Sequence, residues 1–440
     1  MMMKFFFIIM FLMLMMIKNK MLMFYYNLCY LVSFMMMFLY LFKDNIWTNI
    51  SFYFSMSNYS IMLIILSMWI LGLMMMCLDK MEIYKMIIFM FLMFMLIFFF
   101  SSMDLMLFYF SFEVSLIPTF FLILFWGSNP ERVSAAYYLL MYMLLFSFPL
   151  LVYIMDMYIY GMTLKFSLML IIMEYYVFNF WTFMMVYMAF FIKMPIYLFH
   201  IWLPKAHVEA PVYGSMILAG VLLKMGSYGL LRLMEIFISS IKYSYIIFSI
   251  SIIGSLLVSM MCLVQVDMKS LVAYSSVVHM NMMICSLMTM CKLGFLSSYI
   301  MMVSHGLCSS GLFYMVNLYY KRTYSRLLFL NKGMLSLLPS LSLWWFLLCV
   351  INFSFPFSIN FFSEIMMLGV IMNWEISMMF YLMLICFFSS AYSLYLFSYI
   401  QHGNYFMENK FLSSLVKENI VLIMHLYPLI MLLLNMIFFF

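Results

Sequence analysis

Residues 86–100 read MIIFMFLMFMLIFFF, an unbroken run in which every side chain is hydrophobic. A helix with this sequence is apolar on all of its faces, so it must be surrounded by lipid or by other apolar protein. Similar runs recur along the chain, in which 69% of the 440 residues are hydrophobic and 8% are charged. Soluble domains carry about 25% charged residues. The chain is therefore predicted to be an integral membrane protein.

The membrane spans are predicted to be helices and not the strands of a barrel. Barrel strands alternate polar and apolar side chains over about ten residues, and the sequence has no such segments. Helical spans need about 20 apolar residues each, and about fourteen fit the chain. They are 2–17, 21–42, 59–78, 85–100, 103–126, 133–155, 178–203, 212–233, 243–263, 269–290, 295–319, 335–373, 376–400 and 420–439.

Two of these spans contain a predicted break. Pro195 lies two residues after Lys193 in an apolar run, and Pro356 lies between Asn352 and Asn360. Proline removes a backbone donor and clashes with the preceding turn, so it ends or kinks a helix. Paired broken helices are typical of transporters built from inverted repeats. We expect one all-α transmembrane domain, with repeat halves at about 59–233 and 243–400 and flanking helices within 1–42 and 420–440.

Four ionisable residues lie well inside predicted spans: Glu113, Lys193, Lys224 and Glu364. A charge at the bilayer centre costs about 2.5–3.5 kcal/mol on insertion scales, so four cost on the order of 10 kcal/mol. Buried salt bridges between helices would explain them structurally. A path for protons or other ions would explain them functionally, because burial brings lysine and glutamate toward the pH at which they exchange protons.

Two histidines extend the possible path. His279 and His305 lie in apolar segments and have several serines nearby in sequence, which suggests a hydrated chain. Taken singly, each histidine is equally explained as a satisfied interior side chain. No histidine pair has the spacing of a metal site, no CxxC motif occurs among the eight cysteines, and no glycine-rich phosphate loop is present. We therefore expect no metal, iron–sulfur or nucleotide site in this chain.

Loop charge predicts the orientation. With an even number of spans both termini lie on one side, and six loop cations fall on that side against thirteen on the other. Lysine and arginine are enriched in inner loops, so the termini are predicted to face outward. The net charge of +6 is loop charge of this kind and does not indicate binding of nucleic acid.

Four stretches resemble a known family. They are FIKMPIYLFHIWLPKAHVEAPVYGSMILAGVLLKMGSYGLLRL (191–233), FEVSLIPTFFLILFWG (112–127), QVDMKSLVAYSSVVHMN (265–281) and SHGLCSSGLFYMVN (304–317). Together they are similar to the subunit 4 family of NADH dehydrogenase, the antiporter-like membrane-arm subunits of respiratory complex I. The 61 Met residues and the frequent Phe, Tyr and Ile then resemble a mitochondrially encoded, invertebrate-type member.

The resemblance implies proton translocation across the inner mitochondrial membrane and an antiporter-like inverted repeat. It implies that Glu113 and Lys193 form a coupled pair, that Lys224, His279 and His305 continue the relay, and that Glu364 is on the exit side. It further implies partnership with other complex I membrane-arm subunits, neighbouring antiporter-like subunits among them. FMN, iron–sulfur clusters and ubiquinone are expected in partner subunits and not here. The termini would face the intermembrane space, and lipids such as cardiolipin would surround the chain.

Two rival functions stay open at this stage. One is a stand-alone cation/proton antiporter of the related family, and the other is a structural subunit whose charges are locked in salt bridges. Co-purification with a large NADH-oxidising assembly would separate the first, and neutral substitutions at the buried charges would separate the second.

Overall fold

The computed structural model describes residues 22–41, 48–49, 53–79, 82–173, 177–404 and 413–439. The predicted first span, 2–17, lies outside these residues. So do six of the loop cations behind the orientation prediction, which are Lys4, Lys18, Lys20, Lys43, Lys80 and Lys410.

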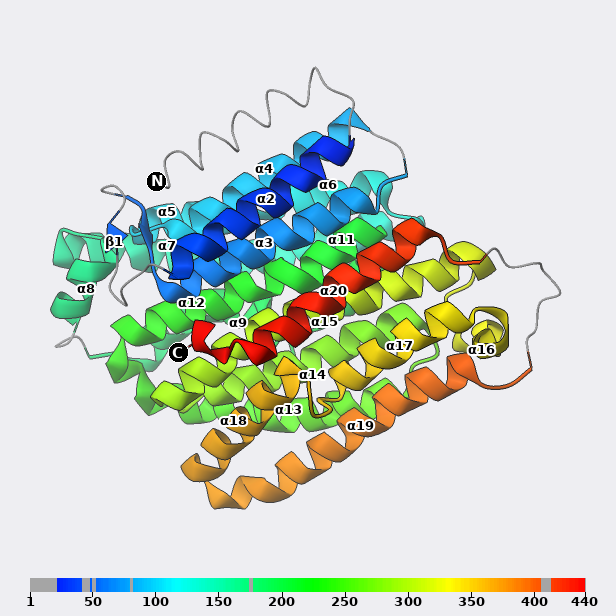
Figure 1. Cartoon of the computed structure of the whole chain (residues 1–440). Coiled ribbons are helices and arrows are strands. Elements are labelled where there is room, and N and C mark those ends of the chain that lie inside the picture. The colour runs from blue at the N-terminus through cyan, green and yellow to red at the C-terminus, as the bar shows by residue number, and fades with distance from the viewer. Residues whose placement is uncertain are drawn as a thin grey trace. The chain divides into compact units, whose positions relative to one another are not determined.

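The chain divides into two compact units. The first comprises Met1–Met194 and Glu209–Tyr243, and the second comprises Pro195–Val208 and Ser244–Phe440. Nearly all of the described residues are helical (Figure 1). One short antiparallel pair, β1 (Thr48–Asn49) and β2 (Ser55–Met56), sets Thr48 opposite Met56.

The first unit is built from α2 (Leu22–Leu41), α3 (Asn58–Met76), α4 (Ile83–Ser101), α5 (Leu105–Val114), α6 (Leu116–Trp126), α7 (Arg132–Gly161), α8 (Phe166–Ile172), α9 (Phe180–Lys193), α11 (Val212–Ile217), the π-helical η2 (Leu218–Leu222), α12 (Leu223–Ile236) and η3 (Ile238–Tyr243). The second unit contains most of α10 (Trp202–Glu209), then α13 (Ser244–Val264), α14 (Met268–Met288), α15 (Lys292–Thr323), η4 (Leu328–Asn331), α16 (Met334–Leu337), α17 (Pro339–Asn352), α18 (Ile359–Trp374), η5 (Ile376–Met378), α19 (Met379–Gln401), α20 (Val416–Leu434) and η6 (Met436–Phe438).

Within the described residues, ten helices are long and apolar enough to cross a membrane, and four more are apolar but shorter. Every predicted span that falls in the described part is represented, and both predicted breaks are present. Helix α9 ends at Lys193, and α17 ends at Asn352 before α18 begins at Ile359. Helix α7 continues beyond its predicted end at 155, because residues 156–160 contain neither glycine nor proline, and it ends at Gly161 with the left-handed Met162 as its cap.

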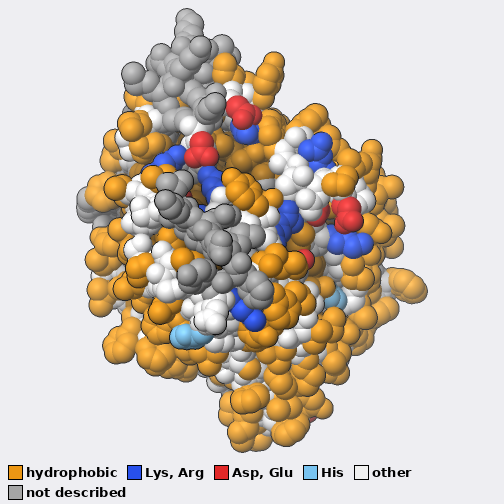
Figure 2. All heavy atoms as spheres, turned by 90° about the vertical axis from the view of Figure 1, so that its right-hand side faces the viewer, with side chains coloured by type: hydrophobic (Ala, Val, Ile, Leu, Met, Phe, Trp, Pro, Cys, Tyr) orange, Lys and Arg blue, Asp and Glu red, His pale blue; other side chains and the backbone are white. Residues whose placement is uncertain are grey.

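Burial separates inner helices from outer ones in each unit. Over the most apolar 18 residues of each span, the span of α11, η2 and α12 and the span of α15 are 100% buried within the protein, and α14 is 94% buried. The corresponding parts of α7 and α19 are only 33% and 28% buried, so most of their apolar surface is left to lipid or to other protein. On the face shown in Figure 2, lysine and arginine side chains lie close to acidic ones and among hydrophobic side chains.

Aromatic side chains form the core of the first unit around the end of α9. The Phe108 ring stacks on Phe99 at 4.3 Å between centroids, and the Phe190 ring lies 5.2 Å from Phe112. Tyr228 joins this cluster at 5.8 Å from Phe99 and donates a hydrogen bond to the backbone oxygen of Phe100. All five rings of this core are nearly or fully buried, so the space next to Lys193 is apolar and densely packed.

Candidate functional site

Lys193 is the last residue of α9, directly before the break at Pro195. Its side chain is 1% exposed. The ammonium Nζ donates to the backbone oxygen of Phe112 at 3.3 Å and lies 3.5 Å from the centroid of the Phe112 ring. A carbonyl oxygen and the negative face of an aromatic ring both favour a cation, so this contact holds the lysine without an ion pair.

Glu113 lies at a second irregularity that the sequence analysis did not predict. Helix α5 ends at Val114 and α6 begins at Leu116, with Ser115 as a turn between them. Pro118 explains this junction, because its nitrogen cannot donate to the carbonyl of Val114. The two carboxylate oxygens of Glu113 are buried and have no hydrogen-bond partner among the described residues. The preceding residue, Phe112, supplies the backbone oxygen that accepts from the Lys193 ammonium, so Glu113 is next in sequence to the residue that holds Lys193.

Lys224 follows directly after the π-helical turn η2. Its side chain is fully buried, and Nζ donates to the backbone oxygen of Ala219 at 2.6 Å. A π turn widens the helix and is common at functional sites. The turn therefore provides a backbone acceptor for this buried ammonium.

Close packing at Gly226 brings α12 against α9. A Cβ atom added to Gly226 would lie 3.1 Å from the backbone oxygen of Phe190 and 3.2 Å from Cβ of Lys193. Glu113, Lys193 and Lys224 thus lie on three neighbouring elements of the first unit. Each of the three lies at or next to a helix end, a junction or a π turn.

The other three predicted residues meet in the second unit. His279 of α14 and Glu364 of α18 lie 3.2 Å apart, measured from Nδ1 to Oε1. The ring of His305, on α15, is 5.5 Å from the ring of His279. The contact between His279 and Glu364 is an ion pair only when the imidazole carries a proton. The attraction between the two charges is therefore present with that proton and absent without it.

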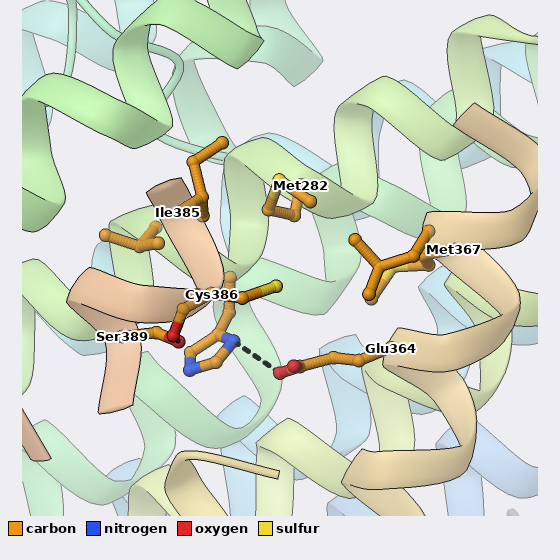
Figure 3. Close-up of a pocket in the computed structure, with 9 residues that line it drawn as sticks. Met282, Glu364, Met367, Ile385, Cys386 and Ser389 are labelled. Atoms are coloured by element: carbon orange, nitrogen blue, oxygen red, sulfur yellow. Dashed lines mark hydrogen bonds and ion pairs between the residues drawn. The ribbon is translucent and has the colours of Figure 1, made fainter. Parts of the chain in front are cut away.

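A small cavity lies against this pair (Figure 3). Its lining includes His279, Glu364, Cys386 and Ser389, and its volume is about 20 Å³ for the centres of water-sized spheres. One water needs about 10–15 Å³ on that measure, together with polar partners. The cavity can therefore hold a water molecule in contact with both the carboxylate and the imidazole, which allows proton exchange there.

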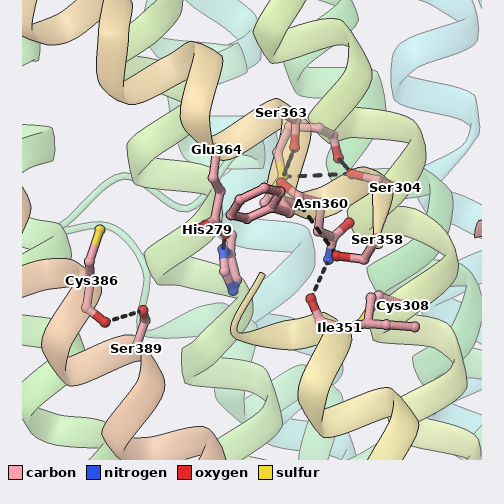
Figure 4. Close-up of polar contacts among 12 residues, drawn as sticks. His279, Ser304, Cys308, Ile351, Ser358, Asn360, Ser363, Glu364, Cys386 and Ser389 are labelled. Carbon is pink, nitrogen blue, oxygen red and sulfur yellow. Dashed lines mark hydrogen bonds and ion pairs between the residues drawn. The ribbon is translucent and has the colours of Figure 1, made fainter. Parts of the chain in front are cut away.

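The second break is stabilised by side chains from its own residues (Figure 4). Asn360 donates through Nδ2 to the backbone oxygen of Ile351 at 3.1 Å, and Ser358 caps α18 by accepting from the amide of Phe361. Ser354 and Phe357 take positive φ angles of 62° and 76°. The interrupted backbone bonds are thus replaced by polar contacts one turn before Glu364.

The serines near the histidines do not link them directly. The hydroxyls of Ser275, Ser276, Ser304, Ser309 and Ser310 each donate to a backbone carbonyl one turn earlier on their own helix. Short hydroxyl side chains in helices commonly bond in this way. The predicted hydrated chain would therefore use serine oxygens as acceptors only.

His200 and His207 pack against rings within the second unit. The His200 ring stacks on Tyr197 at 5.4 Å, and the His207 ring stacks on Phe313 at 4.6 Å with an interplanar angle of 5°. Glu209, two residues after His207, accepts a hydrogen bond from Nδ2 of Asn129 at 3.1 Å.

Two cations counted as loop charges prove to be buried. Arg232 is 4% exposed near the end of α12, where Nε donates to the Tyr228 hydroxyl at 2.9 Å and Nη2 donates to Ser57 at 3.3 Å. Lys269 is 5% exposed and donates to the backbone oxygen of Val208 at 3.4 Å. Arg232, Tyr228 and Lys224 follow at four-residue spacing on one face of α12, a signal that was visible in the sequence and was missed.

The chain is similar in sequence to known proteins. The family model described as "NADH:quinone oxidoreductase/Mrp antiporter, TM" matches residues 102–393. Proteins named NADH-ubiquinone oxidoreductase chain 4 are similar over most of the chain. The one from Ceratitis capitata is 44% identical over 93% of both chains, and the one from Aedes aegypti is 47% identical over 87% of both.

Solved structures share the fold. A chain of "Respiratory complex I from Thermus thermophilus with bound NADH" superposes with a TM-score of 0.86 at 18% identity, covering 95% of this chain and 92% of that one. A chain of the membrane-bound sulfane sulfur reductase, an archaeal respiratory membrane complex, gives a TM-score of 0.82 at 16% identity, covering 91% of this chain and 70% of that one.

Proposed function

Because the chain belongs to the family of NADH-ubiquinone oxidoreductase chain 4, a proton-translocating membrane-arm subunit of complex I, we propose that it moves protons through two groups of buried side chains. The first group is Glu113, Lys193 and Lys224, and the second is His279, His305 and Glu364. We further propose that it lies in the inner mitochondrial membrane with its termini toward the intermembrane space, against other membrane-arm subunits. FMN, iron–sulfur clusters and ubiquinone belong to partner subunits in this proposal.

The observation that carries the proposal is the placement of the first group. A carboxylate without a hydrogen-bond partner, a lysine held by a carbonyl and a ring, and a lysine at a π turn lie on neighbouring helices. A structural ion pair would instead bring the charges into direct contact with all of their hydrogen bonds made. The arrangement leaves Glu113 and Lys193 coupled but not locked.

Such coupling provides a switch. Two unit charges attract by about 4 kcal/mol at 4 Å with an effective dielectric of 20, and this attraction falls as they separate. An energy of that size changes a proton equilibrium by roughly three decades. A movement of Glu113 relative to Lys193 would therefore change how tightly the lysine holds its proton, and the break at Pro195 gives the end of α9 room to move.

The test uses the intact complex carrying variants of this subunit. We expect Lys193→Ala and Glu113→Gln to depress proton pumping and the NADH oxidation coupled to it, while the complex still assembles. Lys193→Arg should not restore pumping fully, because guanidinium does not release its proton. Lys242→Ala, which removes an exposed lysine of η3, is the matched control and should leave pumping unchanged. If the assembled Lys193→Ala complex pumps normally, the lysine is a structural charge and the proposal fails.

A further inference from the structure

A separate polar site lies in the first unit where three connecting segments meet as extended backbone. The amide of Met103 donates to Tyr53, the amide of Phe166 donates to the carbonyl of Met103, and the amide of Leu105 donates to Leu164, all at 2.9 Å. Asp104 and Lys165 oppose each other between the last two of these bonds as an antiparallel bridge. The site lies where α5 begins and α7 leads into α8 (Figure 1).

This register brings the two charges onto one face. Residues flanked by bonds in this way form a non-hydrogen-bonded pair, with Cα atoms about 4.5 Å apart and side chains pointing to the same side. Burial raises the pKa of the Asp104 carboxyl, and the positive charge of Lys165 acts against that rise. The pair thus presents an anion and a cation side by side in a partly dry setting.

A cavity of about 320 Å³ opens at this pair. Asp104 and Lys165 line it together with the hydroxyl-bearing Tyr158 and Thr163, and the rest of the lining is apolar. This volume falls within the roughly 300–1,000 Å³ of small-ligand sites. The lining offers a carboxylate for a cation, an ammonium for an anion and two hydroxyls between them.

The surroundings indicate an amphiphile and not a water-soluble ligand. Asp104 directly precedes the span Leu105–Trp126, and Met162 directly follows the span Arg132–Gly161, so the cavity lies where two spans meet the membrane boundary. Large apolar side chains are exposed on the two helices that begin next to the cavity, with Phe110 of α5 at 60% and Ile171 of α8 at 67%. A headgroup in the cavity would leave acyl chains lying against these side chains of α5 and α8.

We propose that this cavity binds the headgroup of a phospholipid that carries both a phosphate and a primary ammonium, as phosphatidylethanolamine does. Lys165 binds the phosphate and Asp104 binds the ammonium, with Tyr158 and Thr163 at the remaining oxygens. A lysine ammonium has three donors, so Lys165 keeps its attraction to Asp104 while it binds an anion. A purely anionic headgroup would place negative charge beside Asp104, and a quaternary ammonium would offer Asp104 no hydrogen bond.

The experiment uses the purified intact complex, reconstituted in three sets of vesicles. Each set contains a photoactivatable lipid with the same acyl chains and an ethanolamine, choline or glycerol headgroup. After irradiation, mass spectrometry measures labelling of the segments 102–110 and 158–172. We expect the ethanolamine lipid to label them several-fold more than either other lipid.

Variants separate the two charges. Asp104→Asn should bring labelling by the ethanolamine and choline lipids close to equality, and Lys165→Gln should lower labelling by both. Lys242→Gln is the control and should behave as the parent does. NADH:quinone activity confirms that each complex is assembled, and Thr163→Val serves as a milder variant if Asp104→Asn fails to assemble. Equal labelling by all three lipids in the parent complex, or an unchanged preference in assembled Asp104→Asn, overturns the proposal.

Discussion

The packing of α12 against α9 predicts that Gly229→Ala will damage the site from a distance. A Cβ atom at Gly229 would lie 2.3 Å from both Cδ1 and Cε1 of Phe190. Carbon atoms in contact are normally about 3.5–4.0 Å apart, so the overlap exceeds 1 Å. The Phe190 ring has little room to turn, because it is buried and packs 5.2 Å from Phe112 and 6.0 Å from Phe108. Relief must push apart α9 and α12 or displace Phe112, whose ring and carbonyl hold Lys193.

Overpacking of this kind typically costs about 1–3 kcal/mol. That energy corresponds to roughly 5–150-fold in a conformational equilibrium. We expect Gly229→Ala to lower the melting temperature of the assembled complex and to reduce quinone-coupled NADH oxidation several-fold. Both quantities are measurable on the same purified preparation by thermal unfolding and by activity in proteoliposomes.

Two further variants make this reasoning refutable. Gly369→Ala, on the exposed side of α18, adds a Cβ with no atom within 4 Å and should be neutral or slightly stabilising, since alanine is favoured over glycine in helices by about 0.5–1 kcal/mol. Phe190→Leu removes ring atoms that clash, so in the Gly229→Ala background it should recover part of the loss. If Gly229→Ala behaves like Gly369→Ala, or if the double variant is no better than Gly229→Ala alone, the packing argument is wrong.

Three other outcomes are expected. When the imidazole is protonated, His279 and Glu364 attract each other across their 3.2 Å separation. His279→Gln and Glu364→Gln should therefore each impair pumping, and the double variant should be no worse than the more impaired single variant; strictly additive losses would count against a working pair. Asn360→Leu should destabilise the protein by about 0.5–1.5 kcal/mol in thermal unfolding, because the buried carbonyl of Ile351 loses the bond from Asn360 and keeps the one from the amide of Ser354; an unchanged melting temperature would show that the Asn360 bond does not hold the break. The segment 321–332 should react with membrane-impermeant labels from the matrix side only, and labelling from the intermembrane side alone would reverse the proposed orientation.

The spans and the two large breaks were predictable because their causes are local. A long apolar run has to be surrounded by lipid or apolar protein wherever it falls, and proline removes a hydrogen bond at its own position. The junction at Ser115 had the same local cause in Pro118 and was overlooked, because the apolar run continues through it. The π turn at Leu218–Leu222 has no such marker, since it depends on how α12 packs.

The site was predictable as a set of residues but not as a set of contacts. Glu113, Lys193, Lys224 and Glu364 were identifiable because a charge within a span is costly whatever surrounds it. That His279 meets Glu364 depends on the packing of α14, α15 and α18, which no local pattern encodes. For the same reason Arg232 was assigned to a loop, although its partner Ser57 lies 175 residues earlier in the chain.

The segment Pro195–Val208 has a consequence for how the protein is made. It is translated between two parts of the first unit but packs in the second, where Tyr197 fits against Gly254 and His207 stacks on Phe313. At about 5–20 residues per second, the ribosome adds Phe313 on the order of 5–20 s after His207. This segment therefore enters the membrane before the residues that it packs against have been synthesised. A single exchange of sequence with a related chain near residue 243 would keep the first unit whole but would separate Pro195–Val208 from the rest of the second unit, which restricts how recombination can shuffle these halves.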